Sequence, residues 1–97
     1  MFWGFTREAQ QTARVEGRVQ GVGFRYTCYH EGRRLGLTGW VRNNDEGDVE
    51  AWAEGSAEKL ERFIQWLHRG PAGARVDSVK LEQRRPTGSY RHFEIEG

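Results

Sequence analysis

The sequence predicts one α+β domain in which two helices pack on one face of a sheet. Residues 12–20 alternate between apolar and polar side chains, which is typical of a half-buried strand. A later segment instead repeats apolar residues at helical spacing: Leu60, Phe63, Ile64 and Leu67. Ser56 suits the start of that helix, and Gly70 followed by Pro71 suits its end. The predicted order is strand, helix, strand, strand, helix, strand, strand, which favours a layer of helices on a sheet.

The first strand and the first helix meet at a glycine-rich turn. We expect the strand over residues 12–20 and the helix over residues 24–35, with Gly36 as a left-handed stop. The apolar stripe of the helix contains a small residue, Gly32, that lets the helix settle close to the sheet. The stripe consists of Phe24, Cys28, Gly32 and Leu35.

The next two strands form a hairpin. We expect them over residues 37–43 and 48–54, joined by a turn over 44–47 in which Gly47 takes a positive φ. The second of these strands places small apolar residues on one face, which suits close helix packing. They are Val49, Ala51 and Ala53.

Two more strands complete the predicted sheet, over residues 75–83 and 90–96. Val76 is out of phase with the residues that alternate after it and predicts a bulge or a lead-in. Val79 and Leu81 alternate in the first of these strands, and in the second Phe93 and Ile95 are expected to face inward. Right-handed crossovers and helices on one face make this order a two-layer ferredoxin-like sandwich with a short extra C-terminal strand.

The turn between the first strand and the first helix predicts an anion site. Gly21 and Gly23 allow unusual backbone angles and let N–H groups approach a ligand closely. The first N–H groups of the helix lack intrahelical partners and favour a phosphate or a carboxylate. The planar guanidinium of Arg25 can then bind two phosphate oxygens at once. The expected donors are Arg25 and the backbone N–H groups of Gln20, Gly21, Val22, Gly23 and Phe24.

Asn43 ends the strand that follows the first helix. In a split βαβ unit this strand runs parallel to the first strand with one strand between them, so Asn43 and the loop over residues 20–24 should be neighbours. A carboxamide beside a phosphate site can hold a water in line with the phosphorus atom. Taken alone, Asn43 would be interpreted as the first residue of a turn, and it is its expected position beside the loop that favours a functional role.

Composition excludes several classes of protein. Lys and Arg total 15 against 14 Asp and Glu, so the net charge of +1 gives no electrostatic reason to bind a nucleic-acid backbone or an anionic membrane. The lone Cys28 cannot form an internal disulfide. No run is apolar enough to span a bilayer and the start lacks a signal peptide, so we expect a cytoplasmic protein. We divide it into an N-terminal extension over residues 1–11, with the aromatic Phe2, Trp3 and Phe5, and a domain over residues 12–97.

Two long motifs resemble the signatures of the acylphosphatase family. Residues 15–25 read V-x-G-x-V-Q-G-V-x-F-R, and residues 39–55 read G-W-V-R-N-x3-G-x-V-x5-G. The similarity continues through residues 35–37, 70–71, 74–79 and 93–95. The resemblance implies a hydrolase that splits the carboxyl–phosphate bond of acyl phosphates to a carboxylate and inorganic phosphate. It also implies a ferredoxin-like fold without a metal or an organic cofactor, and we expect a monomer.

The resemblance implies a role for each site residue. Arg25 binds the phosphoryl oxygens with the N–H groups of the loop, and Asn43 orients the attacking water. A carboxamide takes up no proton near neutral pH, so the proton passes to the substrate phosphate. Near either motif, no cluster of acidic residues or histidines has the spacing of metal ligands.

Two other functions fit the predicted fold. RNA-recognition domains stack bases on aromatic residues of an open sheet face, where we expect Trp40 and Trp52. Three acids share that face, however, and we expect arginines to pair with them across strands. The acids are Glu16, Glu50 and Glu54, and the arginines are Arg14, Arg18 and Arg42. The second alternative is an acylphosphatase-like accessory fold that channels carbamoyl phosphate in a larger maturation protein, but a chain of 97 residues favours the free-standing enzyme.

Overall fold

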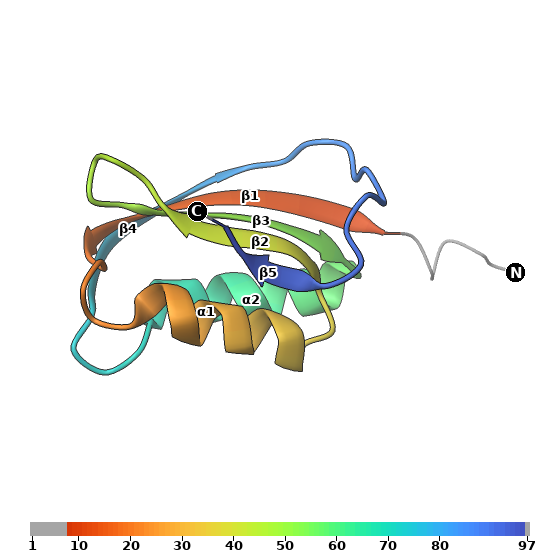
Figure 1. Cartoon of the computed structure of the whole chain (residues 1–97). Helices are drawn as coiled ribbons and strands as arrows, with labels where there is room; N and C mark the ends of the chain where they lie inside the picture. The colour runs from red at the N-terminus through yellow and green to blue at the C-terminus, as the bar shows by residue number, and fades with distance from the viewer. Residues whose placement is uncertain (1–7, 97) are drawn as a thin grey trace, which may run out of the picture.

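Five strands form one mixed sheet, and both helices pack against the same face of it (Figure 1). The computed structural model describes residues 8–96, so Phe2, Trp3 and Phe5 lie outside the described residues. The elements in chain order are β1 (Ala9–Arg18), α1 (Phe24–Arg34), β2 (Thr38–Asn43), β3 (Val49–Gly55), α2 (Ala57–Arg69), β4 (Arg75–Glu82) and β5 (Phe93–Ile95). The strands lie in the order β4-β1-β3-β2-β5, which confirms the predicted ferredoxin-like α+β sandwich with an added C-terminal strand.

The position of β3 decides which loops meet. β3 lies between β1 and β2 and is antiparallel to both, so β1 and β2 run parallel to each other. Val49 of β3 is the register partner of Val15 on one side and of Asn43 on the other. The loop that follows β1 and the end of β2 therefore lie at the same end of the sheet, as the split βαβ order predicted.

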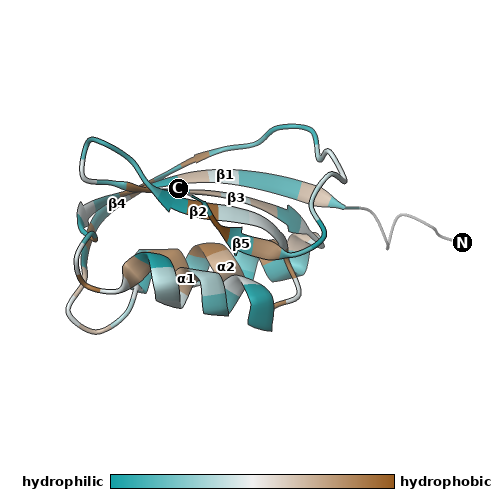
Figure 2. Ribbon diagram, viewed as in Figure 1, coloured by the Kyte–Doolittle hydropathy of each residue, from teal (hydrophilic) through white to brown (hydrophobic). Residues whose placement is uncertain are grey.

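The hydrophobic core fills the layer between the sheet and the helices. Figure 2 shows hydrophobic residues on the strands and helices that meet there, and hydrophilic residues along the β2–β3 turn and the β4–β5 connection. The largest side chains that are almost fully buried include Phe24, Phe63, Phe93 and Leu67. Cys28 is also buried in this layer, as expected for a small apolar residue.

The helix ends agree with the predictions from the sequence. α1 is followed by Leu35 as its cap and by Gly36 at a φ of +73°. At α2, the Ser56 hydroxyl accepts a hydrogen bond from the Lys59 N–H at 3.3 Å, and Gly70 ends the helix at a φ of +68°. No helix among residues 8–96 is long and apolar enough to cross a membrane.

The first strand is displaced from its predicted range. β1 starts at Ala9, which pairs with Gly55, because the polar N-terminal part of the strand still finds a partner in β3. It ends at Arg18, which pairs with the first residue of β4, Arg75. The prediction that the strand continues to Gln20 is wrong, since beyond Arg18 no strand within residues 8–96 offers backbone partners and the chain turns toward α1.

A bulge shifts the phase of β4. The register with β1 slips beside Gly17, so Val76 pairs with Gly17 and Asp77 has no partner of its own. Val76 and Val79 both pack against the core as a result, which confirms the bulge indicated by the sequence. Leu81, which alternates in phase with Val79, is 44% exposed on this edge strand.

The chain crosses the open face of the sheet between its last two strands. β4 and β5 lie at opposite edges, so residues 83–92 must span the sheet to join them (Figure 1). The predicted strand over residues 90–96 is therefore too long, and only Phe93–Ile95 pairs with β2. Ile95 was expected to face inward, but on this edge strand it is 38% exposed.

Glu54 of β3 anchors this crossing segment. Glu54 is only 2% exposed. Its carboxylate nevertheless accepts four hydrogen bonds. The donors are the Thr87 N–H (3.1 Å), the Thr87 hydroxyl (2.9 Å), the Gly88 N–H (2.9 Å) and the Trp52 ring N–H (2.7 Å). The expected pairing of Glu54 with an arginine is wrong, because these neutral donors already satisfy the carboxylate.

Three arginines of the open face were expected to pair with glutamates across strands, and among the described residues only one of them does. Arg42 pairs across strands with Glu50 at 3.0 Å. Arg14 lies 3.4 Å from Glu16, but on the same strand rather than across strands. Arg18 forms no ion pair with any residue in the described range 8–96.

Candidate active site

Two glycines shape the loop between β1 and α1. Gly21 and Gly23 both have a φ of +77°, and a Cβ added at either position would meet no atom within 4 Å. α1 then begins at Phe24 with no side-chain cap and no acidic residue in its first turn. α2 differs, because Ser56 caps it and Glu58 lies in its first turn. The N-terminal N–H groups of α1 therefore keep their preference for an anion.

Arg25 and Asn43 line one cavity above this loop. Its volume is about 170 Å³, and its walls are Val19, Gln20, Gly21, Gly23, Phe24, Arg25, Tyr26 and Asn43. Arg25 comes from the first turn of α1 and Asn43 from the last residue of β2, so the fold unites the two side chains predicted to be neighbours. Of the five residues predicted to offer backbone N–H groups, Gln20 to Gly23 lie between β1 and α1 and Phe24 begins α1; all of them except Val22 line the cavity.

Arg25 is half-buried, and within residues 8–96 its guanidinium forms neither an ion pair nor a side-chain hydrogen bond. Arg14 shows the opposite behaviour, because its Nε lies 2.8 Å from Asp48 Oδ2. This hydrogen bond holds the pKa of Arg14 above its usual value, although burial opposes the effect. The Arg25 guanidinium is thus the charged group at the cavity that has no carboxylate to neutralise it.

Asn43, which lines the same cavity, has an unused hydrogen-bond acceptor. Its Oδ1 atom is buried and has no hydrogen-bond partner among the described residues. A buried carbonyl oxygen without a partner costs roughly 1–3 kcal/mol, so such atoms normally bind a water or a ligand. The Asn43 side chain can therefore accept a hydrogen bond from a small molecule in the cavity.

The turn that follows Asn43 is held by Asn44. The Asn44 Oδ1 atom accepts hydrogen bonds from the N–H groups of Glu46 and Asp48, both at 2.9 Å. The Asn44 N–H donates to the Asp48 carbonyl at 3.0 Å, which closes the turn. Gly47 has a φ of +89°, as the turn chemistry predicted. These bonds give Asn43 a rigid neighbour on its C-terminal side.

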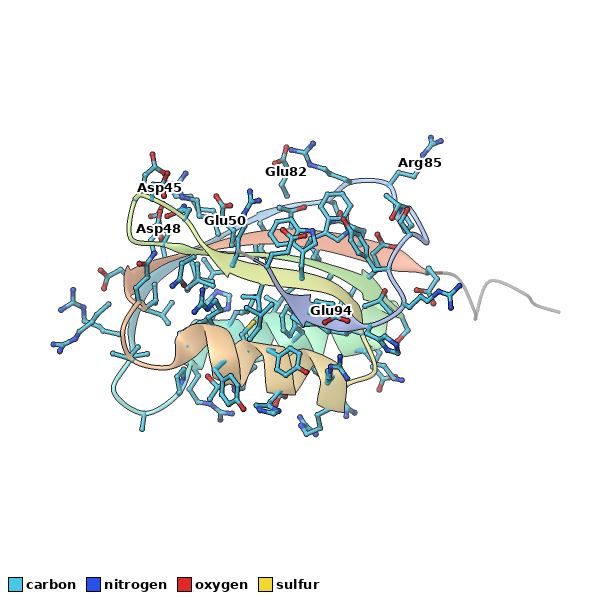
Figure 3. All side chains as sticks on the ribbon, viewed as in Figure 1. Asp45, Asp48, Glu50, Glu82, Arg85 and Glu94 are labelled. Carbon is cyan, nitrogen blue, oxygen red and sulfur yellow. The ribbon has the colours of Figure 1, made fainter. Side chains whose placement is uncertain are left out.

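Charged side chains brace the same turn from the open face. Figure 3 shows Asp48 at the turn, where Arg14 donates to it, and Glu50 just beyond the turn in β3. The Asn44 Nδ2 group donates to Glu50 Oε2 at 3.2 Å. This bond, with help from Arg42 and against the effect of burial, holds the pKa of Glu50 below its usual value. Glu50 therefore stays ionised and supports Asn44 near neutral pH.

Sequence reasoning missed the side chains that support the site. The Gln20 Nε2 group donates to the carbonyl oxygens of Asn44 at 3.0 Å and Asp48 at 2.8 Å, whereas only the backbone of Gln20 was expected to act. Its partners lie 24 and 28 residues away, so no local pattern points to them. Asn44 did have a local signal, because asparagine at the start of a turn commonly bonds to the backbone.

The described residues contain no group of three or more histidines, cysteines, aspartates or glutamates arranged to hold a metal ion. The donors that the cavity offers are instead backbone N–H groups and the Arg25 guanidinium. Such donors bind tetrahedral anions well, and the positive end of α1 adds to their effect.

A protein-family model described as acylphosphatase matches residues 11–95. The chain belongs to the acylphosphatase family. It is 51% identical over 81 residues to the acylphosphatase of Anaeromyxobacter dehalogenans, which covers 84% of this chain and 87% of that relative. The crystal structure of acylphosphatase from Bacillus subtilis matches with a TM-score of 0.88 and 36% identity, over 92% of this chain and 99% of that one. These similarities support acylphosphatase activity.

This acylphosphatase-family chain also resembles part of a larger protein. HypF of T. kodakarensis matches 92% of this chain with a TM-score of 0.80 and 32% identity. The match covers only 12% of the HypF chain. The resemblance to HypF therefore concerns one small portion of that protein, whereas the resemblance to the Bacillus subtilis acylphosphatase spans nearly both chains.

Proposed function

We propose that this chain hydrolyses the carboxyl–phosphate bond of acyl phosphates to a carboxylate and inorganic phosphate without a metal ion. Arg25 binds the phosphoryl group and Asn43 orients the attacking water. The observation that carries the proposal is the single cavity lined by Arg25, Asn43 and the glycines of the β1–α1 loop. Membership of the acylphosphatase family supports the same reaction.

The loop and Arg25 bind the phosphoryl group together. Backbone N–H groups at the start of α1 point their positive ends at the anion, and no side chain caps them. The planar guanidinium of Arg25 adds two parallel hydrogen bonds to phosphate oxygens. Both kinds of donor carry positive charge toward the phosphoryl oxygens, so they stabilise the negative charge that develops there in the transition state.

Asn43 places the water. Its buried Oδ1 atom, which has no partner among residues 8–96, accepts a hydrogen bond from the water. The water oxygen attacks the phosphorus, the bond between phosphorus and the acyl oxygen breaks, and the carboxylate leaves with the electron pair. The amide of Asn43 is not basic near neutral pH, so the proton of the water passes to a phosphate oxygen of the substrate.

The site needs no metal ion because the protein itself supplies the positive charge that stabilises the transition state. Phosphoryl transfer needs charge stabilisation and alignment more than covalent chemistry by the protein. Arg25 and the N–H groups supply the charge stabilisation, and Asn43 supplies the alignment. A carboxylate is a good leaving group, so the reaction needs no strong acid to assist its departure.

The release of inorganic phosphate from benzoyl phosphate in excess EDTA tests this function. We expect the rate in EDTA to equal the rate in untreated buffer. We expect the Arg25→Ala variant to lose the activity in both. Arg85→Ala is a matched control, because Arg85 is exposed and lies at the opposite end of the molecule from the β2–β3 turn (Figure 3). Loss of activity in EDTA with recovery on addition of Mg²⁺ would contradict the proposed mechanism, and no hydrolysis by the native protein would contradict the function.

A further inference from the structure

The carboxamide of Gln20 connects the two halves of the cavity. Gln20 lies in the loop that carries the phosphate-binding N–H groups, and its Nε2 group donates to the carbonyl oxygens of Asn44 and Asp48. The two distances, 3.0 and 2.8 Å, are those of good hydrogen bonds. A primary amide has two N–H donors, so both are used on the turn that follows Asn43.

The loop depends on this connection. β1 ends at Arg18, and in the described part of the chain no neighbouring strand pairs with residues 19–23. Among the described residues, the two bonds of Gln20 are the only side-chain hydrogen bonds that join this loop to residues 43–48. The acceptors lie at both ends of the turn, and Asn44 is covalently linked to Asn43. A shift of the Asn44 carbonyl therefore moves the backbone that carries the Asn43 side chain.

We propose that the Gln20 side chain is a positioning residue, which sets the distance between the bound phosphoryl group and the water held by Asn43. The inference rests on the proposed function of Arg25 and Asn43. Both N–H donors of the Gln20 carboxamide are used on backbone carbonyls, so they are not free to bind the phosphate or the water. Its effect passes through Asn44 to Asn43. In-line attack is sensitive to displacements of about 1 Å, which cost roughly 10²-fold in rate.

This role predicts a separation of turnover from binding in the Gln20→Met variant. Methionine keeps the length and lacks both donors, and it introduces no charge beside the phosphate. We expect kcat for benzoyl phosphate to fall by roughly 10²-fold, while the inhibition constant of inorganic phosphate stays within a factor of about three because the backbone N–H groups and Arg25 remain. Gln83→Met is the matched control, since Gln83 is exposed and its side chain forms no hydrogen bond within residues 8–96.

A double-mutant cycle tests whether Gln20 acts through Asn43. If it does, the second substitution in Gln20→Met/Asn43→Ala costs little beyond the loss in Asn43→Ala, since there is no oriented water left to misplace. Additive losses would overturn the proposal. Native kcat in Gln20→Met would overturn it as well, and so would a parallel loss of phosphate affinity, which would mean that Gln20 only shapes the phosphate site.

A second variant guards against loss of folding. Gln20→Glu keeps the shape of the side chain, but its carboxylate repels the two carbonyls near neutral pH, and its protonated form again donates one hydrogen bond. The ratio of its kcat to that of the native protein should therefore rise as the pH is lowered through the carboxyl titration, whereas the ratio for Gln20→Met should stay flat. A flat ratio for both variants contradicts the inference. Absence of any hydrolysis by the native protein would instead reject the proposed function.

Discussion

Gly32 of α1 lies directly on the ring of Phe93 in β5. A Cβ at Gly32 would come within 2.6 Å of the ring atom Cγ, and two further ring atoms would lie within 2.8 Å. The same ring packs edge-on against Phe63 of α2, with 5.5 Å between the ring centroids. One glycine therefore lets the first helix approach the short edge strand closely enough for both helices to share a single aromatic residue.

We expect Gly32→Ala to destabilise the protein although alanine favours helices. The helical preference of alanine over glycine is worth about 1 kcal/mol, but overpacking against an aromatic ring typically costs about 1–3 kcal/mol. Urea denaturation should show a lower free energy of unfolding. In a Gly32→Ala/Phe93→Leu double variant, the smaller side chain relieves the clash, so the loss should be less than the sum of the single losses. A Gly32→Ala variant more stable than the native protein would contradict this prediction, because it would mean that α1 shifts on β5 to make room for the added methyl group at little cost.

Glu54 should make stability fall at acid pH. Burial raises the pKa of Glu54, but the hydrogen bonds from Trp52, Gly88 and Thr87 outweigh it, so the pKa lies below its usual value of about 4.5. The charged form is thus favoured in the folded protein, and its contribution is present at neutral pH and is lost as the pH falls through the lowered pKa.

The Glu54→Gln variant isolates this contribution. Its carboxamide cannot accept all four hydrogen bonds, so the free energy of unfolding at neutral pH should drop by about 1–3 kcal/mol. Its stability should also change less between about pH 5 and about pH 3 than that of the native protein, as measured by urea denaturation. Glu61→Gln on the exposed face of α2 is the control and should behave as the native protein. Equal pH profiles for the native protein and Glu54→Gln would contradict the assignment.

Arg25→Ala should remove the bidentate contact to the phosphoryl group. Inorganic phosphate should bind much more weakly, and turnover of benzoyl phosphate should fall by about 10³-fold or more, as for other arginines that stabilise phosphoryl transfer. Arg25→Lys should not restore it, because an ammonium keeps the charge and loses the planar fork. Phosphate titration and steady-state kinetics measure both effects. Substantial recovery in the lysine variant would mean that charge alone is needed.

Asn43→Ala should lower turnover while leaving phosphate binding nearly unchanged, whereas Arg25→Ala should weaken both. The phosphate keeps Arg25 and the loop N–H groups, so its affinity should change little, whereas kcat should fall by about 10²–10³-fold because the water loses its orientation. Circular dichroism should show an intact fold, since the Asn43 side chain is only half-buried. An Asn43→Ala enzyme with near-native turnover means that another group holds the water.

Cys28 should be inert in the folded protein. It is fully buried in the core, and burial raises the pKa of its thiol far above neutral pH, so the reactive thiolate does not form. Thiol reagents should modify it only after unfolding. Cys28→Ala should keep the activity and lose about 1 kcal/mol of stability through a small cavity. Rapid inactivation of the native protein by a thiol reagent would contradict this role.

The sequence by itself determined the elements whose signals are local. Ser56 starts α2 because its hydroxyl accepts a hydrogen bond from the helix N-terminus, and Gly70 ends α2 because glycine tolerates a positive φ. Gly21 and Gly23 marked the loop that joins β1 to α1, and the order of elements placed Asn43 beside it. Each of these inferences needs only neighbouring residues or the handedness of a crossover, and both are readable without coordinates.

Only the tertiary structure decided which distant groups meet. The extent of β5 and the exposure of Ile95 depend on the path of residues 83–92 across the sheet, which ends where β2 accepts a parallel partner. Glu54 is held by Thr87 and Gly88 rather than by an arginine for the same reason. The Gln20 carboxamide acts on carbonyls more than twenty residues away. Hydrogen bonds between segments far apart in the chain depend on how the sheet is assembled, so the periodicity of the sequence does not predict them.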